Sequence, residues 1–146
     1  MTLQEQSLLF ANLASLAYGN EKDVRKSARA FGFTKTAFFD HGGAQAYRFE
    51  NKTDVVVACR GTQPTEFNDI KADLKAVPVM AETVSRVHHG FKVEVDEIFP
   101  YIMPKLMEKK NETRKLWFCG HSLGAAMATI MASRAKHDAG LNDRRV

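Results

Sequence analysis

The chain has 146 residues, 45% of them hydrophobic and 26% charged, and a formal net charge of +4. This length fits a single domain with a buried core, and the composition excludes a disordered or fibrous protein. The basic residues are scattered among acids and helix-forming residues. This pattern argues against a nucleic-acid surface but leaves weak attraction to an anionic lipid surface open.

The N-terminus does not look like a secretory leader. Residues 1–18 carry Glu5 early, lack a basic start and space their apolar residues as a helix does. No apolar run reaches the length of a membrane span. Cys59 and Cys119 lie in apolar runs and are expected to be reduced core thiols. We therefore favour a cytoplasmic protein, without settling its compartment, and expect neither a metal nor an organic cofactor.

The first elements predicted are two helices. Residues 3–18 show the apolar spacing of an amphipathic helix, and residues 23–30 form a basic helix that ends before Gly32. The side chains expected to face inward are Leu9, Phe10, Leu13, Leu16, Ala17, Val24, Ala28 and Phe31.

Three strands are predicted next. Residues 33–39 and 44–50 form a hairpin around the turn at 40–43. Residues 55–59 are continuously apolar and mostly β-branched, as is typical of a central strand that is buried on both faces.

The middle of the chain predicts short elements followed by a long helix. Apolar residues at 67, 70 and 74 indicate a short amphipathic segment, and residues 84–87 a short strand with a turn at 88–90. Residues 91–110 repeat apolar residues at helical spacing, with kinks expected at Pro100 and Pro104.

The most informative stretch is Gly120-His121-Ser122-Leu123-Gly124, which lies between an apolar strand at 115–119 and a helix reaching about residue 138. It matches the G-x-S-x-G nucleophile elbow in its required context of strand, sharp turn and helix. Side chains at positions 120 and 124 would clash with the flanking strand and helix, and the helix N-terminus would favour negative charge at the site. The alternative is a tight turn in which Ser122 only caps the helix. We interpret His121 as a residue that shapes the turn.

The order of elements predicts an α/β fold. A hairpin followed by strands that alternate with helices indicates a mixed, mostly parallel sheet with helices on both faces. We expect the 146 residues to form one domain.

Four segments agree with one family: residues 55–62, ending in Arg60-Gly61-Thr62, and residues 69–74, 87–91 and 120–126. Through them the chain resembles the class 3, or fungal-type, lipases of the α/β-hydrolase superfamily over nearly its whole length. The resemblance implies an acyl ester or lipid substrate and transient contact with a lipid interface.

The resemblance also implies roles for individual residues. Ser122 would be the catalytic nucleophile, and Thr62 and Leu123 would provide the donors of the oxyanion hole. For Thr62 the alternative is a loop hydroxyl that caps its own turn. Residues 63–76 would form a lid over the site.

The rest of the catalytic triad is missing from this pattern. A serine hydrolase of this fold needs a serine, then an acid, then a histidine in chain order. After Ser122 the only histidine is His137, which precedes Asp138 and Asp143 and lies about 22 Å along the same predicted helix. We therefore expect the N-terminal portion of a lipase-like domain, without its C-terminal strands and without the acid and histidine of the triad.

Two functions follow. One is a carboxylic ester hydrolase of lipase type that works through an acyl-serine intermediate. The other is a non-catalytic, lipase-like interaction module that binds acyl groups or a partner. In either case the sheet would end on an uncovered edge beside the elbow strand, which would allow self-association.

Overall fold

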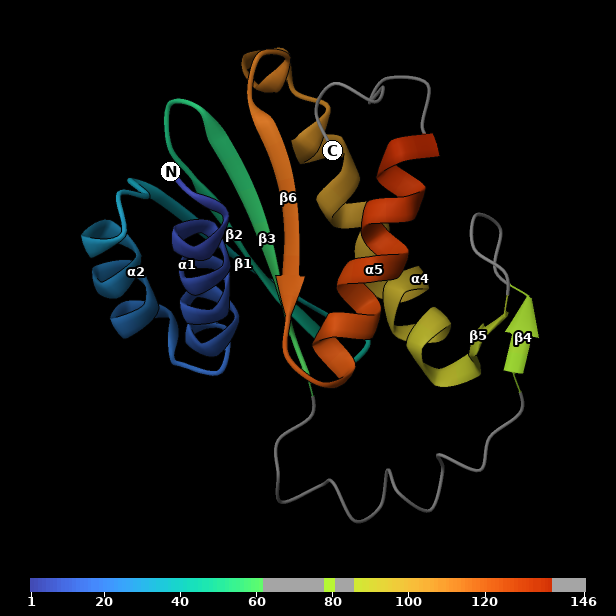
Figure 1. Cartoon of the computed structure of the whole chain (residues 1–146). Coiled ribbons are helices and arrows are strands. Elements are labelled where there is room, and N and C mark those ends of the chain that lie inside the picture. Colours follow the sequence, from blue (N-terminus) through green and yellow to red (C-terminus); the bar gives the residue numbers. More distant parts are fainter. Residues whose placement is uncertain (62–77, 81–85, 138–146) are drawn as a thin grey trace.

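A computed structural model describes residues 1–61, 78–80 and 86–137. In these residues a sheet lies between helices (Figure 1). The elements are α1 (Leu3–Leu16), α2 (Glu21–Ala30), β1 (Lys35–His41), β2 (Ala44–Glu50), β3 (Asp54–Arg60), β4 (Pro78–Met80), β5 (Arg86–His88), α4 (His89–Leu106), the 3-10 helix η2 (Lys109–Asn111), β6 (Lys115–Gly120) and α5 (Leu123–His137).

The main sheet has four strands in the order β1-β2-β3-β6. It is mixed, as predicted, but mostly antiparallel rather than mostly parallel, because β2 runs antiparallel to both β1 and β3 and only β3 and β6 are parallel. The cause is the length of the connections. Short turns join β1 to β2 and β2 to β3, and such turns can join only antiparallel strands, whereas the connection from β3 to β6 is long enough to include α4.

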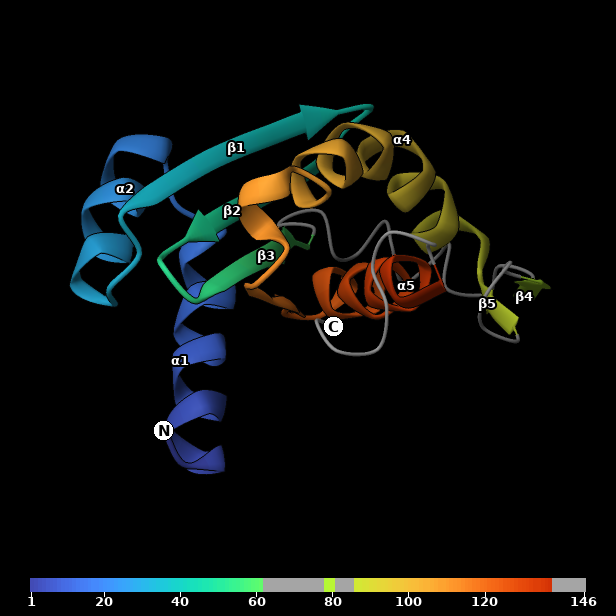
Figure 2. The same cartoon turned by 90° about the horizontal axis from the view of Figure 1, so that it is seen from above.

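Helices cover both faces of the sheet, as predicted (Figure 2). Successive residues of β3 alternate between the two faces. Val55, Val57 and Cys59 join the core formed with α4 and α5, and Val56 and Ala58 join the core formed with α1 and α2. All five are at most 1% exposed, which confirms β3 as an interior strand.

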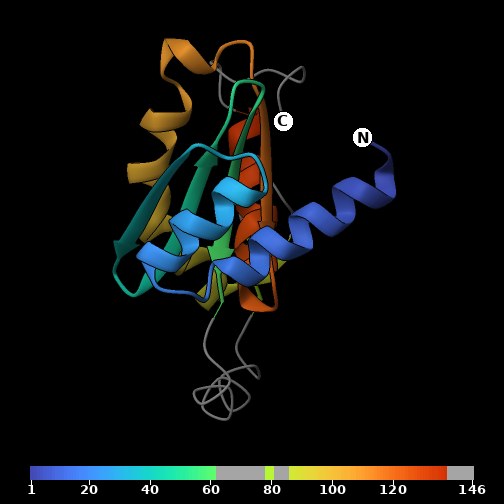
Figure 3. The ribbon, with the colours of Figure 1, turned by 90° about the vertical axis from the view of Figure 1, so that its left-hand side faces the viewer.

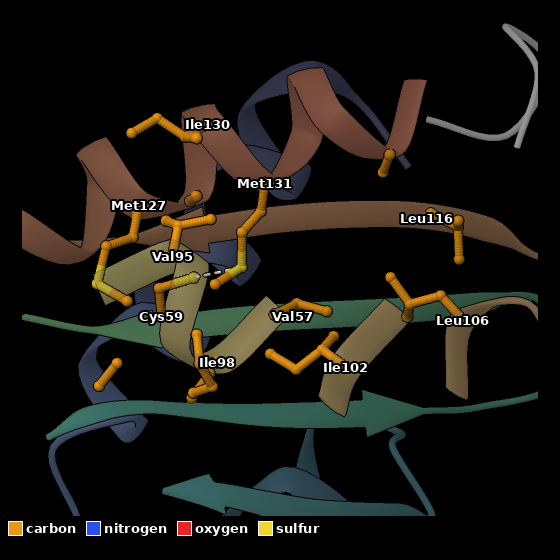
Figure 4. Close-up of a cluster of buried hydrophobic side chains, with 14 of the residues drawn as sticks. Val57, Cys59, Val95, Ile98, Ile102, Leu106, Leu116, Met127, Ile130 and Met131 are labelled. Atoms are coloured by element: carbon orange, nitrogen blue, oxygen red, sulfur yellow. Dashed lines mark hydrogen bonds between the residues drawn. The ribbon is translucent and has the colours of Figure 1, made fainter. Parts of the chain in front are cut away.

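The core between the sheet, α4 and α5 is built from the apolar repeat that predicted the long helix. Val95, Ile98, Ile102 and Leu106 of α4 are fully buried in it (Figure 4). The helix runs through Pro100 and Pro104 and ends at Leu106, four residues before the predicted end. The predicted turn at 88–90 is absent, because β5 passes directly into α4 between His88 and His89.

The first two helices follow the prediction closely. Thr2 and Glu5 form a capping box at the start of α1, with the Thr2 hydroxyl accepting from the Glu5 amide at 3.2 Å. One inward residue was predicted wrongly. Phe31 is 39% exposed, because α2 ends at Ala30 and the chain reverses at Gly32, whose φ is +86°. None of the helices in the described residues is long and apolar enough to cross a membrane.

A buried charge cluster closes the end of the sheet opposite the elbow. Glu50, only 1% exposed, forms ion pairs with Arg48 at 2.7 Å and with Arg114 at 3.0 Å, and Lys110 lies at 3.8 Å. The carboxylate therefore joins the end of β2 to the segment that leads into β6.

Candidate functional site

The candidate site lies where β6 passes into α5. Only His121 and Ser122 separate Gly120, the last residue of the strand, from Leu123, the first residue of the helix. Ser122 has φ +56°, and no other non-glycine residue in the described part of the chain has a positive φ. This left-handed conformation costs a residue with a side chain about 1–2 kcal/mol. The strained turn exposes Ser122 to solvent.

Gly120 and Gly124 leave room for this turn because neither has a side chain. Backbone atoms approach both positions closely. A Cβ atom on Gly120 would lie 2.2 Å from the Gly124 carbonyl oxygen, and one on Gly124 would lie 2.3 Å from the Cys59 carbonyl oxygen. Neither position could hold a side chain without moving backbone. The spacing of the two glycines therefore reflects close packing of β6, α5 and the end of β3.

The end of β3 meets the turn because β3 and β6 are parallel neighbours, with Cys59 opposite Gly120. A Cβ atom on Gly61 would lie 2.8 Å from the His121 carbonyl oxygen and 3.1 Å from the Gly124 nitrogen. Thr62, the first expected oxyanion donor, follows Gly61 directly and lies outside the described residues. The expected lid at 63–76 lies outside them as well.

Leu123, the second expected donor, is the first residue of the 15-residue helix α5. The first N–H groups of a helix have no intrahelical acceptor, and the helix dipole places partial positive charge there. The Leu123 side chain is only 9% exposed and packs into the core. Its backbone amide thus lies on a firmly anchored helix end immediately after Ser122.

Tyr18, two residues after the end of α1, braces the turn. Its hydroxyl donates a hydrogen bond to the His121 carbonyl oxygen at 3.3 Å and lies 3.5 Å from His121 Nδ1. The Tyr18 and His121 rings meet edge to face, and the Arg60 guanidinium lies 5.9 Å from the centre of the Tyr18 ring. The sequence did not reveal this contact, because nothing near Tyr18 signals a partner so distant along the chain.

Neither His41 nor His137 lies beside Ser122. His41 stacks on Tyr101 with ring centres 3.5 Å apart, on β1 at the opposite edge of the sheet. His137 is exposed at the far end of α5. No hydrogen bond joins Ser122 to His41, His121 or His137, the histidines whose side chains the structure describes.

The two cysteines are free thiols, one on each side of the sheet. Burial raises the pKa of Cys59 far above its usual range, with a smaller contribution from Cys119, and raises the pKa of Cys119 to about 12. The Cys59 thiol lies 3.6 Å from the Met131 sulfur (Figure 4). A thiol with a raised pKa stays protonated at neutral pH and is a poor nucleophile. Ser122, which is exposed, is therefore the candidate nucleophile at this end of the sheet.

Comparison with known proteins agrees with this geometry. The family model described as lipase (class 3) matches residues 56–145. No curated protein matches the chain.

Solved structures are similar over nearly all of this chain. A Rhizomucor miehei triacylglyceride lipase is 21% identical, with a TM-score of 0.68, over 97% of this chain and 59% of the lipase. A triacylglycerol lipase whose catalytic centre is a serine-protease triad gives 21% identity and a TM-score of 0.67 over 97% of this chain and 59% of that one. A fungal lipase–inhibitor complex gives 22% identity and a TM-score of 0.68 over 96% and 58%. The chain thus shares part of their fold and spans under two thirds of their length.

Proposed function

The chain belongs to the class 3 lipase family, and on this basis we propose that it serves in carboxylic ester hydrolysis with Ser122 as the nucleophile. The substrate is a triacylglycerol or another acyl ester. The Ser122 hydroxyl oxygen attacks the ester carbonyl carbon while a base takes its proton. The alcohol then leaves with a proton, and water hydrolyses the acyl-serine to free acid and serine.

The observation that carries this proposal is the backbone of Ser122. A strained residue between a strand and a helix persists only where the surrounding structure imposes it, and such residues cluster at functional sites. A serine that served only as a helix cap would adopt extended backbone, as Thr2 and Asn20 do at α1 and α2. The positive φ of Ser122 therefore favours the nucleophile over the cap.

The proposed oxyanion hole rests on two backbone positions. The Leu123 amide at the start of α5 is one donor, and the helix dipole adds to its effect on a developing negative charge. Thr62 supplies the second donor in this proposal. It is supported by the contact of Gly61, its neighbour in sequence, with the elbow backbone.

The proposed mechanism also needs a base and an acid. One similar triacylglycerol lipase has a serine-protease triad as its catalytic centre, and a serine with this chemistry requires a histidine to take its proton. We propose that the histidine and the acid come from polypeptide outside these 146 residues. This division of the site is supported by the places of His41, at the opposite edge of the sheet, and of His137, at the far end of α5.

The lack of a base beside Ser122 in the described residues favours a second candidate function. Without a base the chain would act as a lipase-like module that binds acyl groups or a partner and turns nothing over. Both candidates predict a lipid-directed site, and they differ in whether Ser122 reacts.

A fluorophosphonate probe tests Ser122, because it forms a stable adduct with a nucleophilic serine, and the proposed oxyanion donors would assist that reaction even without the base. We expect slow labelling of the wild-type chain at Ser122 and none in Ser122→Ala, with Ser133→Ala as a matched control that labels like wild type. Labelling that persists in Ser122→Ala would show that the nucleophile is assigned wrongly. No labelling of the folded wild-type chain would contradict the expected reactivity of Ser122 in these 146 residues.

Turnover provides the second measurement. Triad-deficient serine hydrolases retain roughly 10³- to 10⁴-fold acceleration over water from the oxyanion hole and binding. We expect hydrolysis of p-nitrophenyl butyrate by the 146-residue chain not to exceed that residual level, and to be equal in wild type and Ser133→Ala. A large rate that depends on Ser122 would mean that the chain already contains its base.

A further inference from the structure

Helix α2 presents a basic face on the side of the molecule that is turned toward the viewer in Figure 3, where the helix is light blue. Lys22, Lys26 and Arg29 are exposed, and their spacings of four and three residues place them on one face of the helix. Val24 and Ala28 are buried on the other face. Lysine and arginine side chains are almost never fully buried unless they are paired. The basic face is therefore suited to solvent or to an anionic partner.

The acids of α2 are bound to other residues and leave the three cations of this face without a counter-charge. Glu21 pairs with Arg25, and Asp23 accepts a hydrogen bond from the Asn20 side-chain amide at 2.6 Å. Within the described residues none of the three cations forms an ion pair. Residues 20–35 contain five basic and two acidic residues, so the whole segment is net positive.

A second basic segment has the same composition but a different environment. Residues 105–115 also contain five basic and two acidic residues. Lys105 and Lys110 pair with Glu108. Arg114 pairs with a buried carboxylate at 3.0 Å. Three of the five cations of this segment are thus neutralised by the chain itself, whereas the basic face of α2 keeps its charge for a partner.

An exposed aromatic ring ends the basic face. Phe31 follows the last residue of α2 and is 39% exposed. The hollow beside this ring has a volume of about 80 Å³, well below the roughly 300–1,000 Å³ of small-molecule sites. It is too small to enclose a substrate-sized molecule. A row of cations that ends in an apolar ring instead resembles helices that lie in a lipid interface.

The N-terminus of α2 lies next to the candidate site. The helix begins at Glu21, three residues after Tyr18, and the Tyr18 hydroxyl bonds to the His121 carbonyl oxygen of the elbow. A lipid surface held by α2 would therefore extend to the flank of the elbow. This relationship favours a lipid surface over other polyanions, and that choice rests on the proposed function.

We propose that the basic face of α2 binds an anionic lipid surface. The helix lies along the membrane with Lys22, Lys26 and Arg29 among the head groups, and Phe31 enters the interface. The attraction is electrostatic, with each cation close to the surface contributing about fivefold to the affinity. The binding does not require Ser122 to react, so it can be tested independently of ester hydrolysis.

The first test is sedimentation of the 146-residue chain with vesicles. We expect binding to vesicles of equal parts phosphatidylglycerol and phosphatidylcholine, and much weaker binding to pure phosphatidylcholine. The affinity should fall steeply when salt is raised to about 1 M, where the Debye length is about 3 Å. The triple variant Lys22→Gln, Lys26→Gln and Arg29→Gln should bind roughly a hundredfold more weakly.

The matched control lowers the net charge equally in the second basic segment. Lys105→Gln, Lys109→Gln and Lys115→Gln are all at exposed positions, and the variant that combines them should bind nearly as the wild type does. An equal loss of binding in both triple variants would overturn the proposal, because net charge and not the face of α2 would then set the affinity. A wild-type chain that binds anionic vesicles no better than neutral ones would also overturn it.

A fluorescence measurement keeps the three cations in place and remains informative if the triple variant misfolds. Brominated phospholipids should quench the Phe31→Trp chain more strongly than the wild type, whose single tryptophan is Trp117. Tyr101→Trp is the control, at an exposed aromatic position on α4, which packs on the opposite face of the sheet. It should be quenched no more than the wild type. Equal quenching of both variants, or tighter binding of duplex DNA through the same three cations, would contradict the lipid surface on α2.

Discussion

The hydroxyl of Tyr18 donates a hydrogen bond to the backbone carbonyl of His121 across 3.3 Å, and it joins residues 103 positions apart in the sequence. One side chain from the turn that follows α1 thereby holds the turn that carries Ser122. The same hydroxyl lies beside Gly61. A Cβ atom added to Gly61 would be only 2.8 Å from the Tyr18 hydroxyl oxygen. Tyr18 thus packs against both the elbow and the end of β3.

Replacing Tyr18 by Phe keeps the ring contacts and removes only the hydroxyl. We expect the free energy of unfolding to fall by about 1 kcal/mol, the usual worth of one hydrogen bond, and fluorophosphonate labelling of Ser122 to slow. Urea unfolding measures the first effect and labelling kinetics the second. Tyr101→Phe, at an exposed ring stacked on His41, is the control and should change neither.

The strain at Ser122 predicts different stabilities for two substitutions that both remove the hydroxyl. Glycine adopts a φ of +56° without penalty, whereas alanine keeps the Cβ atom that causes the strain. We expect Ser122→Gly to be more stable than Ser122→Ala by about 1 kcal/mol. The comparison is made by chemical denaturation. Equal stabilities would show that the turn is relaxed in solution.

Gly124 offers a test in which helix propensity and packing predict different signs. In an exposed helix Gly→Ala stabilises by roughly 1 kcal/mol. Here the added Cβ would lie 2.3 Å from the Cys59 carbonyl oxygen, so we expect Gly124→Ala to destabilise the protein by about 3 kcal/mol. Ala125→Gly, at the next and exposed position, should lose only about 1 kcal/mol. A stabilised Gly124→Ala protein would contradict the close approach of α5 and β3.

Glu50 is expected to be the most sensitive charged residue. Glu50→Gln leaves Arg48 and Arg114 close together without their counter-charge. We expect a loss of about 3 kcal/mol, at the lower end of the range for breaking a buried ion pair because the cations keep some exposure. Glu112→Gln, at an exposed position, is the control and should change stability by less than about 0.5 kcal/mol.

The thiols predict an unusual pH dependence of alkylation. With the pKa of Cys119 raised to about 12, its thiolate fraction at pH 8 is roughly a thousandfold below that of an unfolded thiol. Because Cys119 stays far below its pKa, its reaction with iodoacetamide should keep rising about tenfold per unit from pH 8 to pH 10, where an ordinary thiol levels off near pH 8.5. Mass spectrometry follows the rate, and fast modification at pH 8 in the folded state would contradict the burial.

Several features of the site could be predicted from the sequence because they are local. Gly120, Ser122 and Gly124 lie within five residues, and the apolar strand before them and the small-residue helix after them are read directly from spacing. The continuous run at 55–59 likewise indicated an interior strand, since burial on both faces requires apolar residues at every position. Family membership follows from these same stretches.

Other features could not be predicted because they join residues far apart in the chain. Tyr18 meets His121, and Glu50 meets Arg114 across 64 positions, with no periodic pattern to mark either pair. The sheet was predicted to be mostly parallel because helices alternate with strands late in the chain, but the short early turns make it mostly antiparallel. Phe31 and Phe33 look alike as apolar residues, and the chain reversal at Gly32 decides which one is buried.

The sequence by itself determined the elements and the strained turn, because backbone propensity and side-chain periodicity act over a few residues. Only the tertiary structure decided what surrounds that turn: Cys59 against Gly124, and Tyr18 against His121. These contacts depend on which strands become neighbours, and strand pairing is settled by the packing of all layers at once. The pattern at residues 120–124 therefore predicted Ser122 as a nucleophile. The residues that pack around Ser122 depend on the fold.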